Sequence, residues 1–149
     1  MNRSSFFLFC KLNCKAMIER EKKFKVGEHT FIVKFPNVGQ IIDMESLKQA
    51  LTNNRYGQMA SSAIVSMYYA LDLVDTIAFF QVCVPEAKRY FDVNDYTALS
   101  PERMDAFMEA YRTEIKPWYD RTMNELRGIK AEEKNDAADG EKSRADVGK

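Results

Sequence analysis

The stretch from Gln58 to Val84 constrains the fold most, because it is apolar on most sides over a length typical of a helix. Its apolar residues recur in steps of mostly three and four, the spacing of one helical face. This seam consists of Ala60, Ile64, Met67, Leu71, Val74, Ala78 and Val82. A helix that is apolar on most sides is usually buried on most sides. The sequence therefore predicts one long central helix.

A membrane span is the alternative interpretation of this stretch, since a span needs about 20 apolar residues. Asp72 and Asp75 interrupt the stretch. Each would cost roughly 2.5–3.5 kcal/mol near the centre of a bilayer. The two carboxylates favour the core helix of a soluble protein over a membrane span.

Before this helix, two short segments alternate apolar and polar residues, which is typical of strands with one buried face. The expected buried residues are Phe24, Val26, Phe31, Val33 and Phe35. Gly27 lies between the segments and tolerates a positive φ, so we expect a β-hairpin. A lone hairpin is marginal in water, and its apolar face must pack on helices.

Capping residues and prolines place the other helices. Asn37 can cap a helix from Val38 to about Thr52, and residues 53–57 form a break. Pro85 opens a short helix that ends at Phe91. Ser100 and Pro101 start a helix that is kinked or restarted at Pro117 and reaches Gly128. The predicted fold class is mainly α: an N-terminal β-hairpin packed on a small helical bundle with one long central apolar helix.

The domain boundaries follow from composition. Residues 1–21 are expected to be a poorly ordered lead. One interpretation is that translation starts at Met17, and the other is that this segment contains an export signal. Residues 22–128 form the predicted single domain. Residues 129–149 combine Ala, Gly and mixed charges without aromatic residues, so a disordered charged tail is expected.

Charge and cysteine content restrict the partners. Lys and Arg number 22, and Asp and Glu also number 22, so the net charge is zero. This balance gives no electrostatic reason to expect nucleic acid or a membrane surface as a partner, and it slightly favours self-association. The three cysteines, Cys10, Cys14 and Cys83, are a poor disulfide framework and suggest a reducing compartment.

Catalytic and metal-binding patterns are weak. Cys10 and Cys14 lack a second pair of ligands, and His29 is the single histidine. Asp72 and Asp75 share a helical face, but without facing Glu or His ligands they are expected to be a satisfied or exposed polar strip. We therefore expect no enzymatic activity, no cofactor and no metal.

Protein binding remains as the expected activity. The eight methionines suit adaptable apolar surfaces, although methionine also fills irregular cores. Aromatic residues point to several sides of the central helix, and a small domain would struggle to cover them all. On the central helix, the candidate contact residues are Met67, Tyr68, Tyr69, Phe79 and Phe80.

The order of these parts resembles the tail assembly chaperones of tailed bacteriophages. The resemblance covers roughly residues 22–91: the hairpin at 24–35, the helix opening at 38–45, the long apolar helix, and the corner Cys83-Val84-Pro85-Glu86. It implies a protein in the cytoplasm of the infected host that binds the tape-measure protein and helps recruit tail-tube subunits. It also implies that the long helix and a second helical face are contact surfaces, the second face being Met104, Phe107, Met108 and Tyr111. The alternative is a permanent component of the phage particle, such as a head, neck or tail protein in a symmetric ring.

Overall fold

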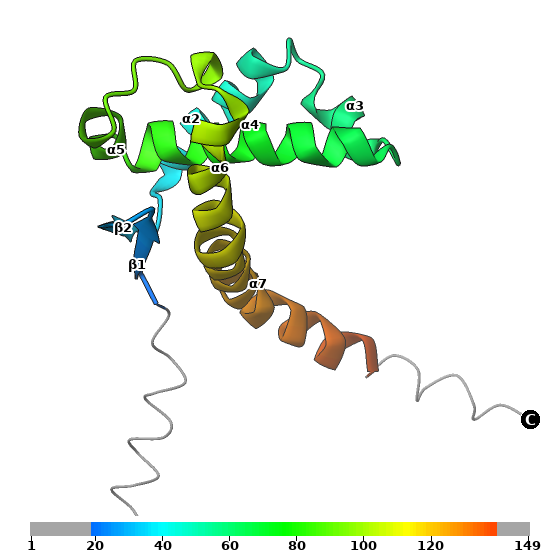
Figure 1. Cartoon of the computed structure of the whole chain (residues 1–149). Coiled ribbons are helices and arrows are strands. Elements are labelled where there is room, and N and C mark those ends of the chain that lie inside the picture. The colour runs from blue at the N-terminus through cyan, green and yellow to red at the C-terminus, as the bar shows by residue number, and fades with distance from the viewer. Residues whose placement is uncertain (1–18, 140–149) are drawn as a thin grey trace, which may run out of the picture. The chain divides into compact units, whose positions relative to one another are not determined.

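The computed structural model describes the backbone of residues 19–139 and the side chains up to residue 128 (Figure 1). The predicted mainly helical fold with an N-terminal hairpin is confirmed. The predicted single domain of residues 22–128 divides into a larger unit, Arg20–Pro117, and a smaller unit that contains Glu19 and the chain from Trp118 onward. Most of the lead, residues 1–18, and the last ten residues lie outside the described residues.

The hairpin pairs β1 (Glu21–Val26) with β2 (His29–Lys34) in antiparallel register, with Val26 opposite His29. Gly27 opens the two-residue turn with φ +60°, a conformation that costs glycine least. The expected apolar face is buried: Phe24, Val26, Phe31 and Val33 are at most 4% exposed, and Phe35 is partly buried. In the hairpin, β1 lies against α6, and His29 of β2 stacks on Tyr90 of α5.

Helix α2 (Val38–Leu51) begins where the sequence predicts. The Asn37 side chain accepts a hydrogen bond of 2.9 Å from the Gln40 backbone, and the Gln40 side chain accepts one of 3.0 Å from the Asn37 backbone. This reciprocal pair forms a capping box that satisfies two backbone N–H groups at the start of the helix. Met44 is the most buried residue of α2, which packs against α4.

The predicted helix from Gln58 to Val84 is interrupted, so its predicted start was wrong. It consists of α3 (Tyr56–Ser61) and α4 (Val65–Cys83), with extended backbone at Ser62 and Ile64 between them. The Ser61 hydroxyl donates to the Gly57 carbonyl at 3.0 Å, and the Ser62 hydroxyl accepts from the Ile64 backbone at 3.4 Å. Serine hydroxyls in such local bonds compete with the helical pattern and favour an end or a cap.

The core of the larger unit surrounds the second half of α4. Residues 76–80 are all buried, and Phe80 is fully enclosed. Its ring lies 5.9 Å from the ring of Phe24 and 5.2 Å from that of Phe107, both in edge-to-face geometry. Rings from the hairpin, α4 and α6 thus meet at Phe80, and such pairs add specific geometry to the burial of apolar area.

After α4 the chain turns through α5 (Glu86–Tyr90) and the short 3₁₀ helix η1 (Tyr96–Ala98). Helix α6 (Pro101–Ala110) starts as predicted, with the Ser100 hydroxyl accepting from the Arg103 backbone at 3.4 Å. Figure 1 shows α4 crossing the larger unit, with α3 near its N-terminal end and α5 near its C-terminal end.

The kink predicted at Pro117 takes the form of a π-helical turn, η2 (Tyr111–Ile115), just before α7 (Lys116–Asp139). Proline lacks an N–H, and its ring crowds the carbonyl of the preceding turn, so a widened turn relieves the clash. Helix α7 passes through Gly128 and reaches Asp139, so the helical end predicted at Gly128 was wrong. Residues 129–139 are rich in Ala, Glu and Lys, which have high helix propensity.

Candidate functional site

Four large apolar side chains are exposed together at the N-terminal end of α4. Ile64 and Val65 are 59% and 79% exposed, and Tyr68 and Tyr69 are about half exposed. We call these four residues the apolar tip. Met67 lies between them in the sequence and is partly buried. Clustered exposure of this kind marks contact surfaces more often than scattered single residues do.

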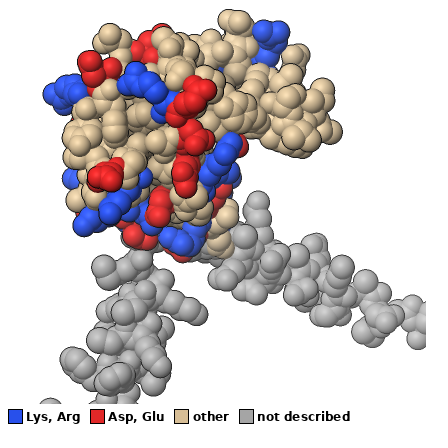
Figure 2. Space-filling view, viewed as in Figure 1, with Lys and Arg blue, Asp and Glu red and all other residues tan. Residues whose placement is uncertain are grey.

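The tip lies in a stretch without charge. Arg55 and Asp72 are successive charged residues in the sequence, so residues 56–71 carry none. Figure 2 shows the result: the projecting end of the larger unit is almost entirely tan, with blue only near its upper edge. Charged residues are depleted at the centre of protein interfaces, and this end of the molecule shares that composition.

An apolar pocket of about 280 Å³ lies beside the tip. Tyr69, Leu73 and Ile77, spaced one turn apart on α4, form one wall. The other wall comes from α6 and the segment that leads into it, and it contains Leu99, Pro101 and Met104, with Tyr96 and Thr97 completing the lining. None of the lining residues is charged at neutral pH, so the pocket suits an apolar occupant.

The candidate contact residues from the sequence separate into two groups. Tyr68 and Tyr69 belong to the exposed apolar tip, and Met67, next to them in the sequence, is partly buried. The other six are buried, at 9% exposure or less: Phe79, Phe80, Met104, Phe107, Met108 and Tyr111. These six side chains cannot form a contact surface in the folded chain, because they are buried in its core.

Met104 differs from the other buried candidates, because it also lines the pocket. The structure thus brings Tyr69 of α4 and Met104 of α6 to one site. Ile64, Val65 and most of the pocket lining were missed by sequence reasoning. The uncharged run between Arg55 and Asp72 was the signal that could have located the tip. The pocket has no such signal, since its walls meet only in the folded chain.

The carboxylates of Asp72 and Asp75 both contact other side chains of this chain, which agrees with the sequence interpretation of a satisfied polar strip. Asp72 Oδ2 accepts from Arg112 Nε at 3.1 Å. Asp75 Oδ1 accepts a hydrogen bond of 2.6 Å from the Tyr56 hydroxyl and lies 3.6 Å from Lys48 Nζ. Burial and the hydrogen bond to Asp75 raise the pKa of Tyr56 well above its usual range.

Cys83 and the single histidine, His29, each pack against a side chain of another element. Cys83 Sγ lies 3.8 Å from Met44 Sδ, and burial raises the pKa of its thiol to about 12. A raised pKa keeps the thiol protonated, whereas nucleophilic cysteines have lowered values. The His29 ring stacks on the Tyr90 ring at 3.7 Å. Within the described residues, no three His, Cys, Asp or Glu side chains are grouped as metal ligands; Cys10 and Cys14 lie outside this part of the chain.

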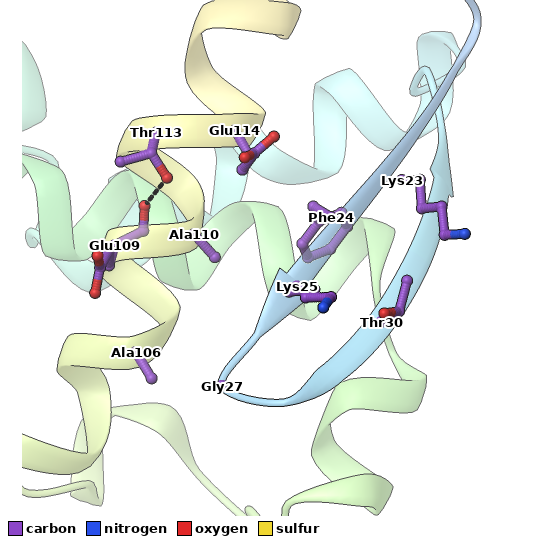
Figure 3. Close-up of a pocket in the computed structure, with 10 residues that line it drawn as sticks. All are labelled: Lys23, Phe24, Lys25, Gly27, Thr30, Ala106, Glu109, Ala110, Thr113 and Glu114. Atoms are coloured by element: carbon purple, nitrogen blue, oxygen red, sulfur yellow. Dashed lines mark hydrogen bonds between the residues drawn. The ribbon is translucent and has the colours of Figure 1, made fainter.

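A second, polar groove of about 600 Å³ separates β1 from α6 and η2 (Figure 3). Lys23 and Lys25 line it from the hairpin, and Glu109 and Glu114 from the helical side. Lys22 Nζ and Glu114 Oε2 are 3.3 Å apart, so an ion pair joins β1 to η2.

No helix among residues 19–139 combines the length and the apolar character needed to cross a membrane. The comparisons with known proteins identify no family for this chain: neither a protein-family model, nor a curated protein, nor a solved structure matches it.

Proposed function

We propose that this protein acts by binding other proteins through the apolar tip and the pocket beside it, without catalysis. The observation that carries the proposal is the tip itself: four exposed apolar side chains within a run of 16 uncharged residues, 56–71. Exposing this surface to water has a free-energy cost that binding removes, about 25 cal/mol per Å² of apolar area. A partner that covers it should present a mainly apolar surface, because the tip carries no formal charge.

The resemblance to tail assembly chaperones supports a specific form of this proposal. In that form the protein is a non-enzymatic morphogenesis protein of a tailed phage, working in the cytoplasm of the infected bacterium. Its partners are the tape-measure protein, whose apolar helices would cover the tip, and tail-tube subunits.

The test is co-expression with the tape-measure protein and tail-tube subunit of the same phage, followed by affinity co-purification. The critical variant is Ile64→Asp. Ile64 occupies the N-cap position of α4 without a side-chain cap, so aspartate there improves the cap while adding charge to the tip. We expect at least about tenfold weaker partner binding with the fold intact.

Ile42→Asp is the matched control, because Ile42 is also 59% exposed. It lies in α2, close to Met44, which contacts Cys83 at the opposite end of α4 from the tip. Ile42→Asp should bind like the wild type. Equal binding by Ile64→Asp would show that the tip is not the contact surface. A fixed ring at every concentration, measured by light scattering and without partner binding, would instead support a permanent particle component.

A further inference from the structure

We infer that the free edge of β1 binds an extended, acidic segment of another protein as a third, antiparallel strand. Each strand of a two-stranded hairpin has one unpaired edge, and adding a strand to such an edge is a common way to recognise an extended segment. The inference goes beyond the proposed function, because this edge shares no residue with the apolar tip. It names a second binding site and the chemistry of the segment that would fill it.

The register of the hairpin determines which backbone groups of β1 are unpaired. In an antiparallel pair, residues that hydrogen-bond to the neighbouring strand alternate with residues whose N–H and C=O groups point outward. The Phe35 N–H donates to the Arg20 carbonyl at 2.7 Å, which continues the ladder of the hairpin. The even-numbered residues of β1 therefore face β2. The N–H and C=O groups of Glu21, Lys23 and Lys25 point away from β2, and no backbone partner for them occurs within the described part of the chain.

The polar groove lies along this edge and provides room for a strand. Its volume is about 600 Å³, and Lys23 and Lys25 line it from β1. Ala106 and Ala110 line it from the helical side, and Figure 3 shows both on the side of α6 toward the hairpin. An added strand lies about 4.8 Å from its neighbour. Alanine side chains extend only one carbon from the backbone, so the helical wall takes up little of the groove.

Charge determines which side chains the added strand should carry. Lys23 and Lys25 are exposed, and neither forms an ion pair within the described residues. A residue directly opposite a lysine on the added strand lies on the same face, where an opposite charge is stabilising. On the helical wall, Lys22 offsets the charge of Glu114 at 3.3 Å, and Glu109 is exposed to water, which screens it. Acidic residues at alternate positions therefore fit the two lysines.

The same charges favour a partner over other parts of this chain. If two β1 edges paired around Lys23, Lys25 would meet Glu21 of the other copy, but Lys23 would face itself, and like charges opposite each other are destabilising. An acidic segment opposes both lysines with carboxylates. Residues 1–18 carry basic residues and no Asp or Glu, so they lack this complementarity.

The experiment adds the peptide acetyl-Glu-Val-Glu-Val-Glu-Val-amide to the full chain, while the shifts of backbone amides and their exchange with water are followed by NMR. We expect saturable shifts in residues 21–25 and 106–114. The amides of Lys23 and Lys25 should exchange more slowly in the complex, because they become hydrogen-bonded. The amide of Phe24 already faces β2 and should change little. The same peptide with lysine in place of glutamate should bind about fivefold more weakly.

Methylation of the peptide backbone separates strand addition from attraction between charges. In antiparallel pairing, the glutamates opposite Lys23 and Lys25 donate their N–H groups to β1, whereas the N–H groups of the valines point away from it. N-methylation of the glutamates should therefore abolish saturable binding, and N-methylation of the valines should leave it.

A charge reversal tests the role of the lysines. Lys23→Glu, at an exposed side chain, should weaken binding of the glutamate peptide by about fivefold and strengthen binding of the lysine peptide. Arg55→Glu is the matched control, because it makes the same change of charge at an exposed residue that precedes α3. This control should bind both peptides like the wild type.

The inference is overturned if exchange at Lys23 and Lys25 is not slowed, if the two methylated peptides bind equally, or if Lys23→Glu has no more effect than Arg55→Glu. Shifts confined to residues 64–69 would place the peptide on the apolar tip and reject the edge. Exchange that slows with protein concentration alone would assign the edge to a second copy. Failure here can be told from failure of the proposed function, because Ile64→Asp changes the tip and should bind the peptide like the wild type.

Discussion

Phe80 and Tyr68 lie on the same helix, roughly three turns apart, in opposite environments: Phe80 is 0% exposed and Tyr68 is 52% exposed. Both belong to α4, and both are large aromatic residues in an apolar stretch. The hairpin and α6 reach the second half of the helix, where the ring of Phe80 meets those of Phe24 and Phe107. The first half extends beyond them and forms the apolar tip.

This contrast predicts that truncation to alanine lowers the free energy of unfolding by different amounts at these two positions. Phe80→Ala should lower the free energy of unfolding by about 3–5 kcal/mol, because it leaves a cavity in the core. Tyr68→Ala should change it by less than about 0.5 kcal/mol, because the ring already contacts water. Urea denaturation followed by circular dichroism measures both values. Similar losses for the two variants would contradict the division of α4 into a buried half and an exposed half.

A second prediction concerns the hydrogen bond of 2.6 Å between the Tyr56 hydroxyl and Asp75 Oδ1, which connects α3 to α4. Tyr56→Phe removes the donor, and a bond to a charged group contributes more than a neutral one. We expect a loss of about 1–2 kcal/mol, moderated because Lys48 still faces Asp75. Thermal unfolding gives the value. Tyr68→Phe, at an exposed hydroxyl, is the control and should be neutral.

A third prediction concerns alkaline pH. Burial raises the pKa of Tyr96 from 10.0 to about 12, and Glu86 adds to the effect. The folded chain therefore holds this proton more tightly than the unfolded chain does. The resulting stability is fully present below pH 10 and is lost as the pH rises through about 12. Cys83, whose pKa burial raises from 9.0 to about 12, adds a loss in the same direction that begins one pH unit lower.

Tyr96→Phe isolates the contribution of this hydroxyl. The Tyr96 hydroxyl is buried and has no hydrogen-bond partner among the described residues. Its removal should raise stability at pH 7 by about 1 kcal/mol, since a buried unsatisfied group is costly. It should also flatten the decline between pH 10 and 12. Denaturation midpoints across this range test both effects, and a variant that declines as steeply as the wild type would contradict the assignment to Tyr96.

A fourth prediction compares two glycines. Gly27 has φ +60°, and a Cβ built there meets no atom within 4 Å, so the cost of Gly27→Ala comes from the backbone alone. We expect a loss of about 1 kcal/mol. Gly57 lies in helix α3 and is also unobstructed, so Gly57→Ala should stabilise the protein by about 0.5–1 kcal/mol. Opposite signs in a denaturant titration confirm the turn geometry, and equal signs contradict it.

Local features of the sequence determined the elements that depend on interactions between residues close together in the chain. The alternation around Phe24 and Phe31 marked the buried face of the hairpin, and Asn37 and Ser100 marked two helix starts through the hydrogen bonds that their side chains accept. The break at Ser62 was missed because the apolar spacing continues through it, while the serine hydroxyls favour an interruption.

Only the tertiary structure decided which apolar residues are covered. Phe79 and Tyr69 have similar apolar surroundings in the sequence, yet Phe79 is core and Tyr69 is half exposed at the rim of the pocket. The periodicity of the sequence shows that one face of a helix is apolar, but it does not show which other element packs against that face. That depends on where the hairpin and α6 pack along α4, a contact between segments far apart in the chain. The pocket that joins Tyr69 to Met104 exists for the same reason: its two walls are adjacent only after folding.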